Sequence, residues 1–278
     1  MEEKEKKRLK EKADKLRADV LKTVTKANSG HPGGALGMAD VLTTMRYRFM
    51  EERPQEPHWE DRDRFVLSNG HTCPILYVTL ADKGYFPREE LDSFRQLGGL
   101  LQGHPSTAKG TPGVEFSSGS LGHGLSFASG VALAGRLNGQ DYKTFCSISD
   151  AECQEGQTWE AAGVARHQQL GNLCALVDYN DSQIDGKVSD VMDVAPLADK
   201  WESFGWHVLE IDGHDYDEIE KAFQEFEKGR APEADPTVIV CHNVLGKGVS
   251  FMEGDYHWHH GVLTEEQLEQ ALSELGQD

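Results

Sequence analysis

The chain has 278 residues and carries 28 Lys and Arg against 47 Asp and Glu, which gives a formal net charge of -19. Such acidity disfavours nucleic acid and anionic membrane surfaces as partners, and no run of about 18 apolar residues is present to span a bilayer. We therefore expect neither a nucleic-acid nor a membrane partner. Because no apolar signal segment stands at the N-terminus, we also expect a cytoplasmic protein.

Apolar residues recur at three- and four-residue steps near the N-terminus and predict an amphipathic helix within residues 1–28. Short apolar runs and helical stretches then alternate along the chain. The runs predict strands at 64–68, 144–148, 173–178, 206–211 and 237–241, and the stretches predict helices at 126–137, 156–170, 216–228 and within 262–278. This alternation predicts a single α/β domain over 1–278, with a parallel central sheet covered by helices on both faces.

Asp150 stands just beyond the predicted strand TFCSI, where an aspartate is commonly a turn residue or a helix cap. Ligands of parallel sheets, however, bind beyond the carboxyl ends of the strands, and Asn180 follows the next strand at the same edge. Neighbouring strands lie about 4.8 Å apart, so both side chains are expected to reach one cation. Oxygen donors suit Mg²⁺, and phosphate oxygens often complete its coordination shell. The sequence therefore predicts a magnesium-diphosphate site.

The segment SDAECQEG, with the residues up to Gln183, resembles the thiamine diphosphate motif, in which an aspartate between two glycines opens a stretch that an asparagine closes. The flanking sequences SGHPGG, LSNGH, GHPS, GSLGHG and QLGNL are similar to transketolase and follow in the same order. The chain thus resembles the N-terminal half of transketolase, as the separate subunit of a split enzyme. The resemblance implies the thiamine-diphosphate-binding fold.

Thiamine diphosphate with Mg²⁺, or with Ca²⁺ or Mn²⁺ in its place, is the cofactor that this resemblance implies. The implied metal ligands are Asp150, Asn180 and the backbone carbonyl of Ser182, and the other implied cofactor contacts are His71, Gly119, Ser120, Leu121, Ala151, Glu152, Lys247 and His259. A solvated lysine is the alternative for Lys247. Ser149 and Ala151 replace the two glycines of the motif, and a methyl group at Ala151 is tolerated if φ is negative.

The resemblance also implies that His31, His104 and His259 are catalytic. His31 and His259 would transfer protons around the substrate, and His104 would hydrogen-bond a hydroxyl or carbonyl oxygen of the donor, because imidazole can donate or accept a proton near neutral pH. Idle histidines in capped loops are the alternative, and His257 or His260 could take the place of His259. His123 is expected to line the pocket without a chemical role. Five further histidines are expected to be surface residues: His58, His167, His207, His214 and His242.

The implied activity is transfer of a two-carbon ketol unit from a ketose phosphate to an aldose phosphate, as in the pentose phosphate pathway. No second α/β pattern follows residue 261, so we expect a C-terminal transketolase subunit with a pyrimidine-binding domain as partner, in an α₂β₂ assembly. A surface around Leu121, Phe127 and Trp159 is expected to form the interface. The alternatives are a subunit of a deoxyxylulose-phosphate synthase, 2-oxo acid or sulfo-sugar enzyme, or a non-catalytic binding protein.

Overall fold

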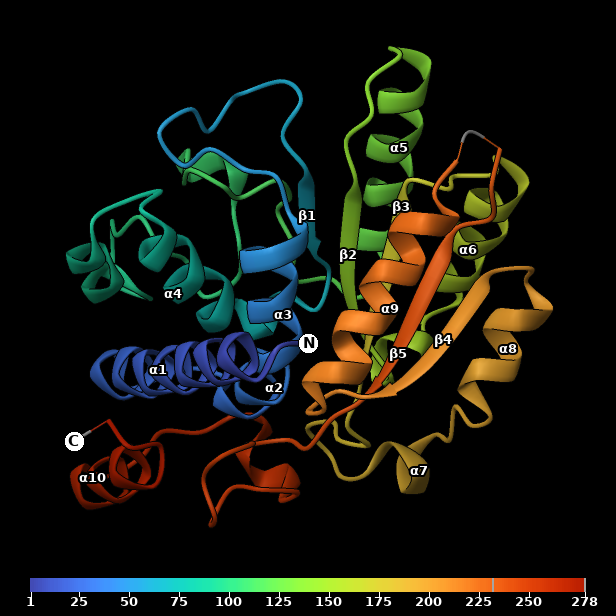
Figure 1. Ribbon diagram of the computed structural model, residues 1–278. Helices are drawn as coiled ribbons and strands as arrows, with labels where there is room; N and C mark the ends of the chain where they lie inside the picture. Colours follow the sequence, from blue (N-terminus) through green and yellow to red (C-terminus); the bar gives the residue numbers. More distant parts are fainter. Residues whose placement is uncertain (232, 278) are drawn as a thin grey trace.

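Five parallel strands form one sheet in the order β1-β2-β3-β5-β4 in the computed structural model, which describes residues 1–231 and 233–277. The strands are β1 (Arg64–Leu67), β2 (Thr144–Ser149), β3 (Leu173–Tyr179), β4 (His207–Asp212) and β5 (Thr237–His242). Figure 1 shows helices on both sides of this sheet. The predicted fold class is therefore confirmed, and each predicted strand differs from the observed one by at most one residue at either end.

Ten α-helices lie in the described ranges. They are α1 (Glu3–Ala27), α2 (Pro32–Gly37), α3 (Ala39–Thr44), α4 (Cys73–Lys83), α5 (Gly124–Leu137), α6 (Gly156–His167), α7 (Val188–Val191), α8 (Leu197–Ser203), α9 (Tyr216–Gly229) and α10 (Glu265–Glu274). The sequence did not predict α2, α3 and α4, because these helices are buried on nearly all sides and have no polar stripe to give a helical period. None of the ten helices is long and apolar enough to cross a membrane.

Alternate side chains of the strands enter two separate apolar cores, one on each face of the sheet. Phe145, Cys174 and Leu176 pack in the first core, which α1, α3, α4 and α9 cover. Cys146 and Val177 pack in the second core, beneath α5, α6 and α8. Burial on both faces explains why the central strands read as continuous apolar runs rather than as alternating ones.

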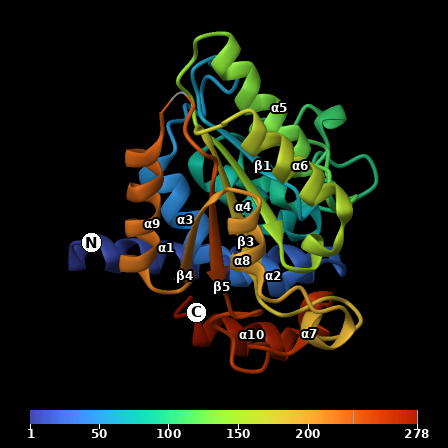
Figure 2. The same cartoon turned by 90° about the vertical axis from the view of Figure 1, so that its right-hand side faces the viewer.

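The strand arrows point toward α2, α7 and α10, so the carboxyl ends of the strands face this part of the molecule (Figure 2). Two segments from opposite ends of the chain meet at this edge. Gly246 N donates to Gly33 O at 2.9 Å, and Gly261 N donates to Gly30 O at 3.1 Å. The approach is close enough that a Cβ on Gly33 would lie 2.6 Å from the Trp258 carbonyl oxygen, so this position requires glycine.

Candidate active site

Asp150 lies directly after β2 and is completely buried. Its Oδ1 accepts a hydrogen bond from Ala151 N at 2.7 Å, and its Oδ2 accepts one from Asp181 N at 2.7 Å. The side chain therefore caps the short 3-10 helix Ala151–Gln154, which is the common role of an aspartate just after a strand. It also joins the ends of β2 and β3, because Asp181 belongs to the loop that follows β3.

Asn180 reaches the same edge, and its amide contacts a residue to which the sequence patterns assigned no role. Asn180 Nδ2 donates to Asp178 Oδ2 at 2.8 Å, while Asn180 Oδ1 accepts from Ser182 N at 3.0 Å. Asp178 pairs in register with Ser149 and is buried within β3. Asn243 Nδ2, from beyond β5, donates to Asp178 Oδ1 at 2.8 Å. An aspartate in the otherwise apolar run LCALVD was the available sign of this role.

Asp150 and Asp178 form a buried acidic pair whose charge the described side chains do not neutralise. Burial, and after it the neighbouring Asp178, raises the pKa of Asp150 to about 8. Burial likewise raises the pKa of Asp178 to about 6. Within the described ranges, both carboxylates accept side-chain or backbone hydrogen bonds from amide groups. A cation beside Asp150 would favour the ionised form of this pair.

The donor set at this edge fits a hard divalent cation. A carboxylate of Asp150, the amide oxygen of Asn180 and a backbone carbonyl at Ser182 are all oxygen donors. In residues 1–231 and 233–277, no three His, Cys, Asp or Glu side chains are grouped to hold a metal ion by themselves. A cation here therefore needs further oxygen atoms from a ligand, which is how Mg²⁺ commonly binds together with phosphate groups.

Ala151, which replaces a motif glycine, is compatible with this geometry. It lies in the short 3-10 helix and is not among the residues with positive φ, so its methyl group causes no backbone strain. Its N-H donates to the Asp150 carboxylate. The condition for a tolerated alanine, a negative φ, is therefore met.

Glu152 is completely buried and holds the glycine-rich loop 117–124 through hydrogen bonds. Its Oε1 accepts from Gly122 N at 2.7 Å and from the Ser68 hydroxyl, and Ser68 Oγ in turn accepts from Gly124 N at 3.0 Å. Burial raises the pKa of Glu152 to about 7. This carboxylate thus holds the loop that carries Gly119, Ser120 and Leu121, through Gly122 N directly and through the Ser68 hydroxyl.

Five histidines, His31, His71, His104, His259 and His260, form a histidine cluster at the same end of the molecule. The ring centroid of His31 lies 5.3 Å from that of His71, 6.4 Å from His104, 5.7 Å from His259 and 4.7 Å from His260. His71 and His259 are 4.9 Å apart. The three histidines predicted to be catalytic and the one predicted to contact the cofactor are therefore together, although they come from four separate segments.

Burial is the main cause that lowers the pKa of His31, His71, His104 and His259, and neighbouring histidines add to it for His31, His71 and His259 while Arg95 adds to it for His104. The pKa of His31 is lowered to about 2 and that of His71 to about 3, and the pKa values of His104 and His259 are lowered too. His31 Nδ1 is buried and has no hydrogen-bond partner among the described residues. Neutral imidazoles of this kind can both donate and accept hydrogen bonds to a substrate.

The structure separates the three candidates at residues 257, 259 and 260. His257 is exposed and bonds Asp255 Oδ1 at 2.6 Å, outside the cluster. His259 and His260 both approach His31. Gly119 belongs here as well, because it has φ 144 and a Cβ on it would lie 3.3 Å from the His104 ring.

The remaining sequence-predicted positions lie outside the cluster. Lys247 is partly exposed and pairs with Glu253 at 3.3 Å. His123 is exposed at the start of α5. His58, His167, His207 and His242 are exposed, as expected, but His214 is not a surface residue: its Nδ1 contacts Asp40 Oδ2 at 2.8 Å, and its Nε2 accepts from Val244 N at 2.9 Å. The surface expectation for His214 was therefore wrong, because its partners lie far away in the sequence.

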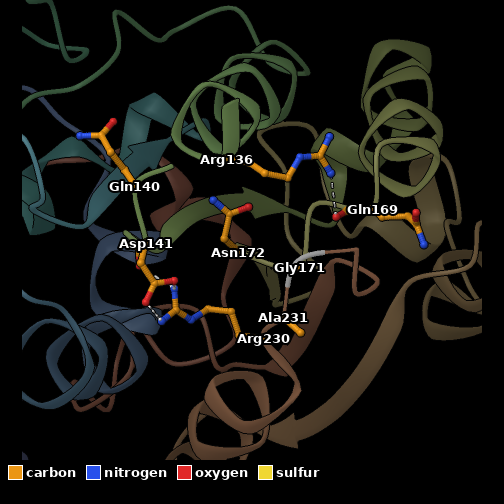
Figure 3. A pocket seen from close by; sticks show the side chains of 8 residues that line it. All are labelled: Arg136, Gln140, Asp141, Gln169, Gly171, Asn172, Arg230 and Ala231. Carbon is orange, nitrogen blue, oxygen red and sulfur yellow. Dashed lines mark hydrogen bonds and ion pairs between the residues drawn. The ribbon is translucent and has the colours of Figure 1, made fainter. Parts of the chain in front are cut away.

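A separate cavity of about 90 Å³ lies at the opposite, amino end of the sheet, lined by residues that include Arg136, Asp141, Asn172 and Arg230 (Figure 3). Its two arginines already have partners. Arg230 pairs with Asp141 at 2.9 Å, and Arg136 donates to the Gln168 and Gln169 carbonyls. The charged groups of this cavity are thus satisfied within the chain, which favours a structural role.

The family model described as "Transketolase, thiamine diphosphate binding domain" matches residues 9–278. An apulose-4-phosphate transketolase subunit from Phocaeicola vulgatus is 40% identical over 95% of this chain and 92% of its own length. The 6-deoxy-6-sulfo-D-fructose transketolase subunit of a Clostridium species is 42% identical over 96% of both chains.

Among solved structures, the transketolase from Leishmania mexicana has a TM-score of 0.91 and 32% identity over 97% of this chain. The chain spans 41% of the length of that transketolase. The resemblance to the N-terminal half of transketolase, as found in separate subunits, is thereby confirmed. The chain belongs to the transketolase family and corresponds to its thiamine diphosphate-binding domain.

Proposed function

We propose that this chain is the cofactor-binding subunit of a two-chain transketolase that transfers a two-carbon ketol unit between sugar phosphates. One observation carries the proposal: a buried carboxylate pair that receives only amide hydrogen bonds lies at the same sheet edge as a cluster of histidines with lowered pKa values. A cation-diphosphate site and a proton-transferring site at one edge are what this chemistry needs.

In this proposal Asp150, Asn180 and the Ser182 carbonyl hold Mg²⁺, or Ca²⁺ or Mn²⁺ in its place. His71, Gly119, Ser120, Leu121, Ala151 and His259 line the cofactor, Glu152 fixes the loop beneath it, and Lys247 lies at the periphery. When bound, thiamine diphosphate supplies the carbanion chemistry that carries the ketol unit. The single domain 1–278 then supplies the position of the cofactor and the electrostatic environment.

The residues His31, His104 and His259 are proposed to hold or move protons on the oxygens of the substrate. Their lowered pKa values keep them neutral at pH 7, so each can accept a proton or donate a hydrogen bond. Burial within the cluster also restricts water around the reacting atoms.

A complementary C-terminal subunit is proposed to provide the pyrimidine-binding domain, in an α₂β₂ assembly in the cytoplasm. Two relatives of similar length are named as transketolase subunits, which supports this view. Phe127 is 39% exposed and stacks on Phe116, and Trp159 is partly exposed beside Trp201 and Phe204, which supports an apolar interface at α5 and α6. A stable interface of this kind buries well over about 1,000 Å².

The sugar substrate has two candidates of one reaction class. One relative is named for apulose 4-phosphate and the other for 6-deoxy-6-sulfo-D-fructose, and the chain is similarly identical to both. We propose a ketose phosphate donor with an aldose phosphate acceptor, and a sulfonated ketose as the second candidate donor.

The test is a ketol-transfer assay with thiamine diphosphate and Mg²⁺, run on the purified chain and on the chain with its complementary subunit. We expect no transfer by the chain alone and transfer in the mixture, with either the phosphorylated or the sulfonated ketose. Full activity of the isolated chain contradicts the two-subunit proposal. No activity of a cofactor-loaded mixture with any ketose of the two kinds contradicts the proposed reaction.

A further inference from the structure

Arg95 bridges the two chain segments that carry His31 and His104. Its Nη1 donates to Ser29 Oγ at 3.0 Å, and its Nη2 donates to the Gly103 carbonyl oxygen at 3.3 Å. Ser29 lies two residues before His31, and Gly103 lies directly before His104. One planar guanidinium therefore connects both histidine segments, which are otherwise far apart in the sequence.

The backbone around Arg95 is shaped to hold this bridge. Arg95 has φ 56, a left-handed conformation that is uncommon for a residue with a side chain, and its N-H donates to Leu101 O at 2.9 Å. A Cβ on Gly103 would lie 2.9 Å from Arg95 Cζ, so the guanidinium packs against the Gly103 backbone. Even the smallest side chain at residue 103 would push the guanidinium out of place.

The positive charge of Arg95 is not neutralised by a carboxylate. Although the chain contains 47 Asp and Glu, the ion pairs of the described residues do not include Arg95. Its Nε is also buried without a hydrogen-bond partner in the described part of the chain. An arginine that only stabilises a fold in so acidic a chain would be expected to pair with an acid.

We propose that Arg95 is a positioning residue that fixes His31 and His104 relative to each other and supplies an uncompensated positive charge beside them. The proposal rests on the proposed function, in which these two histidines face the substrate. It adds a residue that neither contacts the cofactor motif nor belongs to the histidine cluster.

The charge of Arg95 lowers the pKa values of both histidines. Burial is the largest cause of the lowered pKa of His104, and Arg95 is the next. For His31, burial acts first, then His71, His259 and His260, and then Arg95. His31 and His71 are the other titratable neighbours of His104. Removing the guanidinium is therefore expected to raise the pKa of His104 more visibly than that of His31.

Three variants separate the two roles. Arg95→Met removes the charge and the bridge, Arg95→Lys keeps the charge without the planar fork, and Gly103→Ala keeps the arginine but displaces its guanidinium. Arg53→Met is the matched control, since Arg53 is an exposed arginine that pairs with Glu56. Circular dichroism of each full-length variant verifies folding before any comparison, and the Lys and Ala variants test the proposal if the Met variant does not fold.

The first measurement is an NMR titration of the imidazole carbons in the full-length chain between pH 5 and 8. We expect the pKa of His104 to rise in Arg95→Met, to move less in Arg95→Lys and to stay unchanged in Arg53→Met. An unchanged His104 titration in Arg95→Met overturns the electrostatic role. This readout needs neither cofactor nor activity, so it is independent of the proposed reaction.

The second measurement is kcat of the assembled enzyme beside its thiamine diphosphate affinity. Since a displacement of about 1 Å can reduce a rate about 100-fold, we expect losses of that order in Arg95→Met and smaller ones in Arg95→Lys and Gly103→Ala, with cofactor affinity retained. Wild-type kcat in folded Arg95→Met and Gly103→Ala overturns the positioning role. If the wild-type enzyme shows no measurable affinity for thiamine diphosphate, that result contradicts the proposed function and not the positioning role.

Discussion

Two buried aspartates of this chain have opposite surroundings. Asp40, on α3, accepts from Arg17 Nη2 at 2.6 Å and from the Tyr216 hydroxyl at 2.5 Å, and it contacts His214. Burial alone would raise its pKa, but Arg17 and these hydrogen bonds hold the pKa well below its usual range. Asp150 is equally buried, yet its pKa is raised to about 8.

The difference distinguishes a structural carboxylate from one that we propose to hold a cation. His214 accepts from Val244 N through Nε2, so its Nδ1 carries the proton that is donated to Asp40, and the carboxylate is satisfied on both oxygens. Asp150 receives only amide hydrogen bonds and lies beside a second acid, Asp178. A folded chain retains such an unfavourable pair where a function requires it.

The largest expected effect concerns the histidine cluster. Replacing His31 or His104 with alanine is expected to lower kcat of the assembled enzyme about 10²- to 10⁴-fold, because each removes an acid-base group. Thiamine diphosphate affinity, measured by calorimetry, should change only a few-fold. Equal losses in kcat and in affinity would show that these histidines hold the cofactor, and no loss in either would leave them idle.

Asp40→Asn is expected to destabilise the fold by up to about 3–5 kcal/mol, because it leaves the buried Arg17 guanidinium with Asp14 as its one remaining carboxylate partner among the described residues. Urea unfolding monitored by circular dichroism measures this loss. The matched change Asp150→Asn should cost less, about 1–2 kcal/mol, since it removes an uncompensated buried acid but leaves one of the two backbone N-H groups at residues 151 and 181 without an acceptor. If both variants lose the same stability, the distinction between the two aspartates is wrong.

The pH dependence of stability provides a smaller effect. The pKa of His71 is lowered to about 3 in the folded chain, so the neutral form contributes stability above the unfolded pKa of about 6.5, and this is lost as the pH falls toward 3. One such histidine changes the unfolding free energy by up to about 1.4 kcal/mol per pH unit below 6.5. Urea titrations at pH 7 and 5.5 should show a weaker pH dependence for His71→Asn, and an identical dependence would contradict the assignment.

The sequence was sufficient to predict the parallel sheet, both chain-terminal helices and the position of Asp150. These features depend on local patterns, namely apolar runs, helical periodicity and a polar residue after a strand. The glycine-rich motifs also indicated which loops gather at the carboxyl edge, and the structure brings His31, His71, His104 and His259 together there.

Other features depend on contacts that no local pattern records. Asp178 looked like the end of an apolar strand, and its role is visible only beside Asn180 and Asn243. His214 was assigned to the surface because Asp40, its partner, lies 174 residues away. The cofactor contact predicted for Glu152 stays a prediction, and the hydrogen bond from Gly122 N to its carboxylate was not visible in the sequence.

The most direct test of the central claim is calorimetric titration of thiamine diphosphate into the chain with its complementary subunit, with and without Mg²⁺. Asp150→Ala is compared with wild type and with Arg53→Met as the folded control. We predict Mg²⁺-dependent binding in wild type and control and a loss of at least about 100-fold in Asp150→Ala, because that variant removes the carboxylate ligand. Tight Mg²⁺-dependent binding by Asp150→Ala would contradict the assignment of this edge as the metal-diphosphate site.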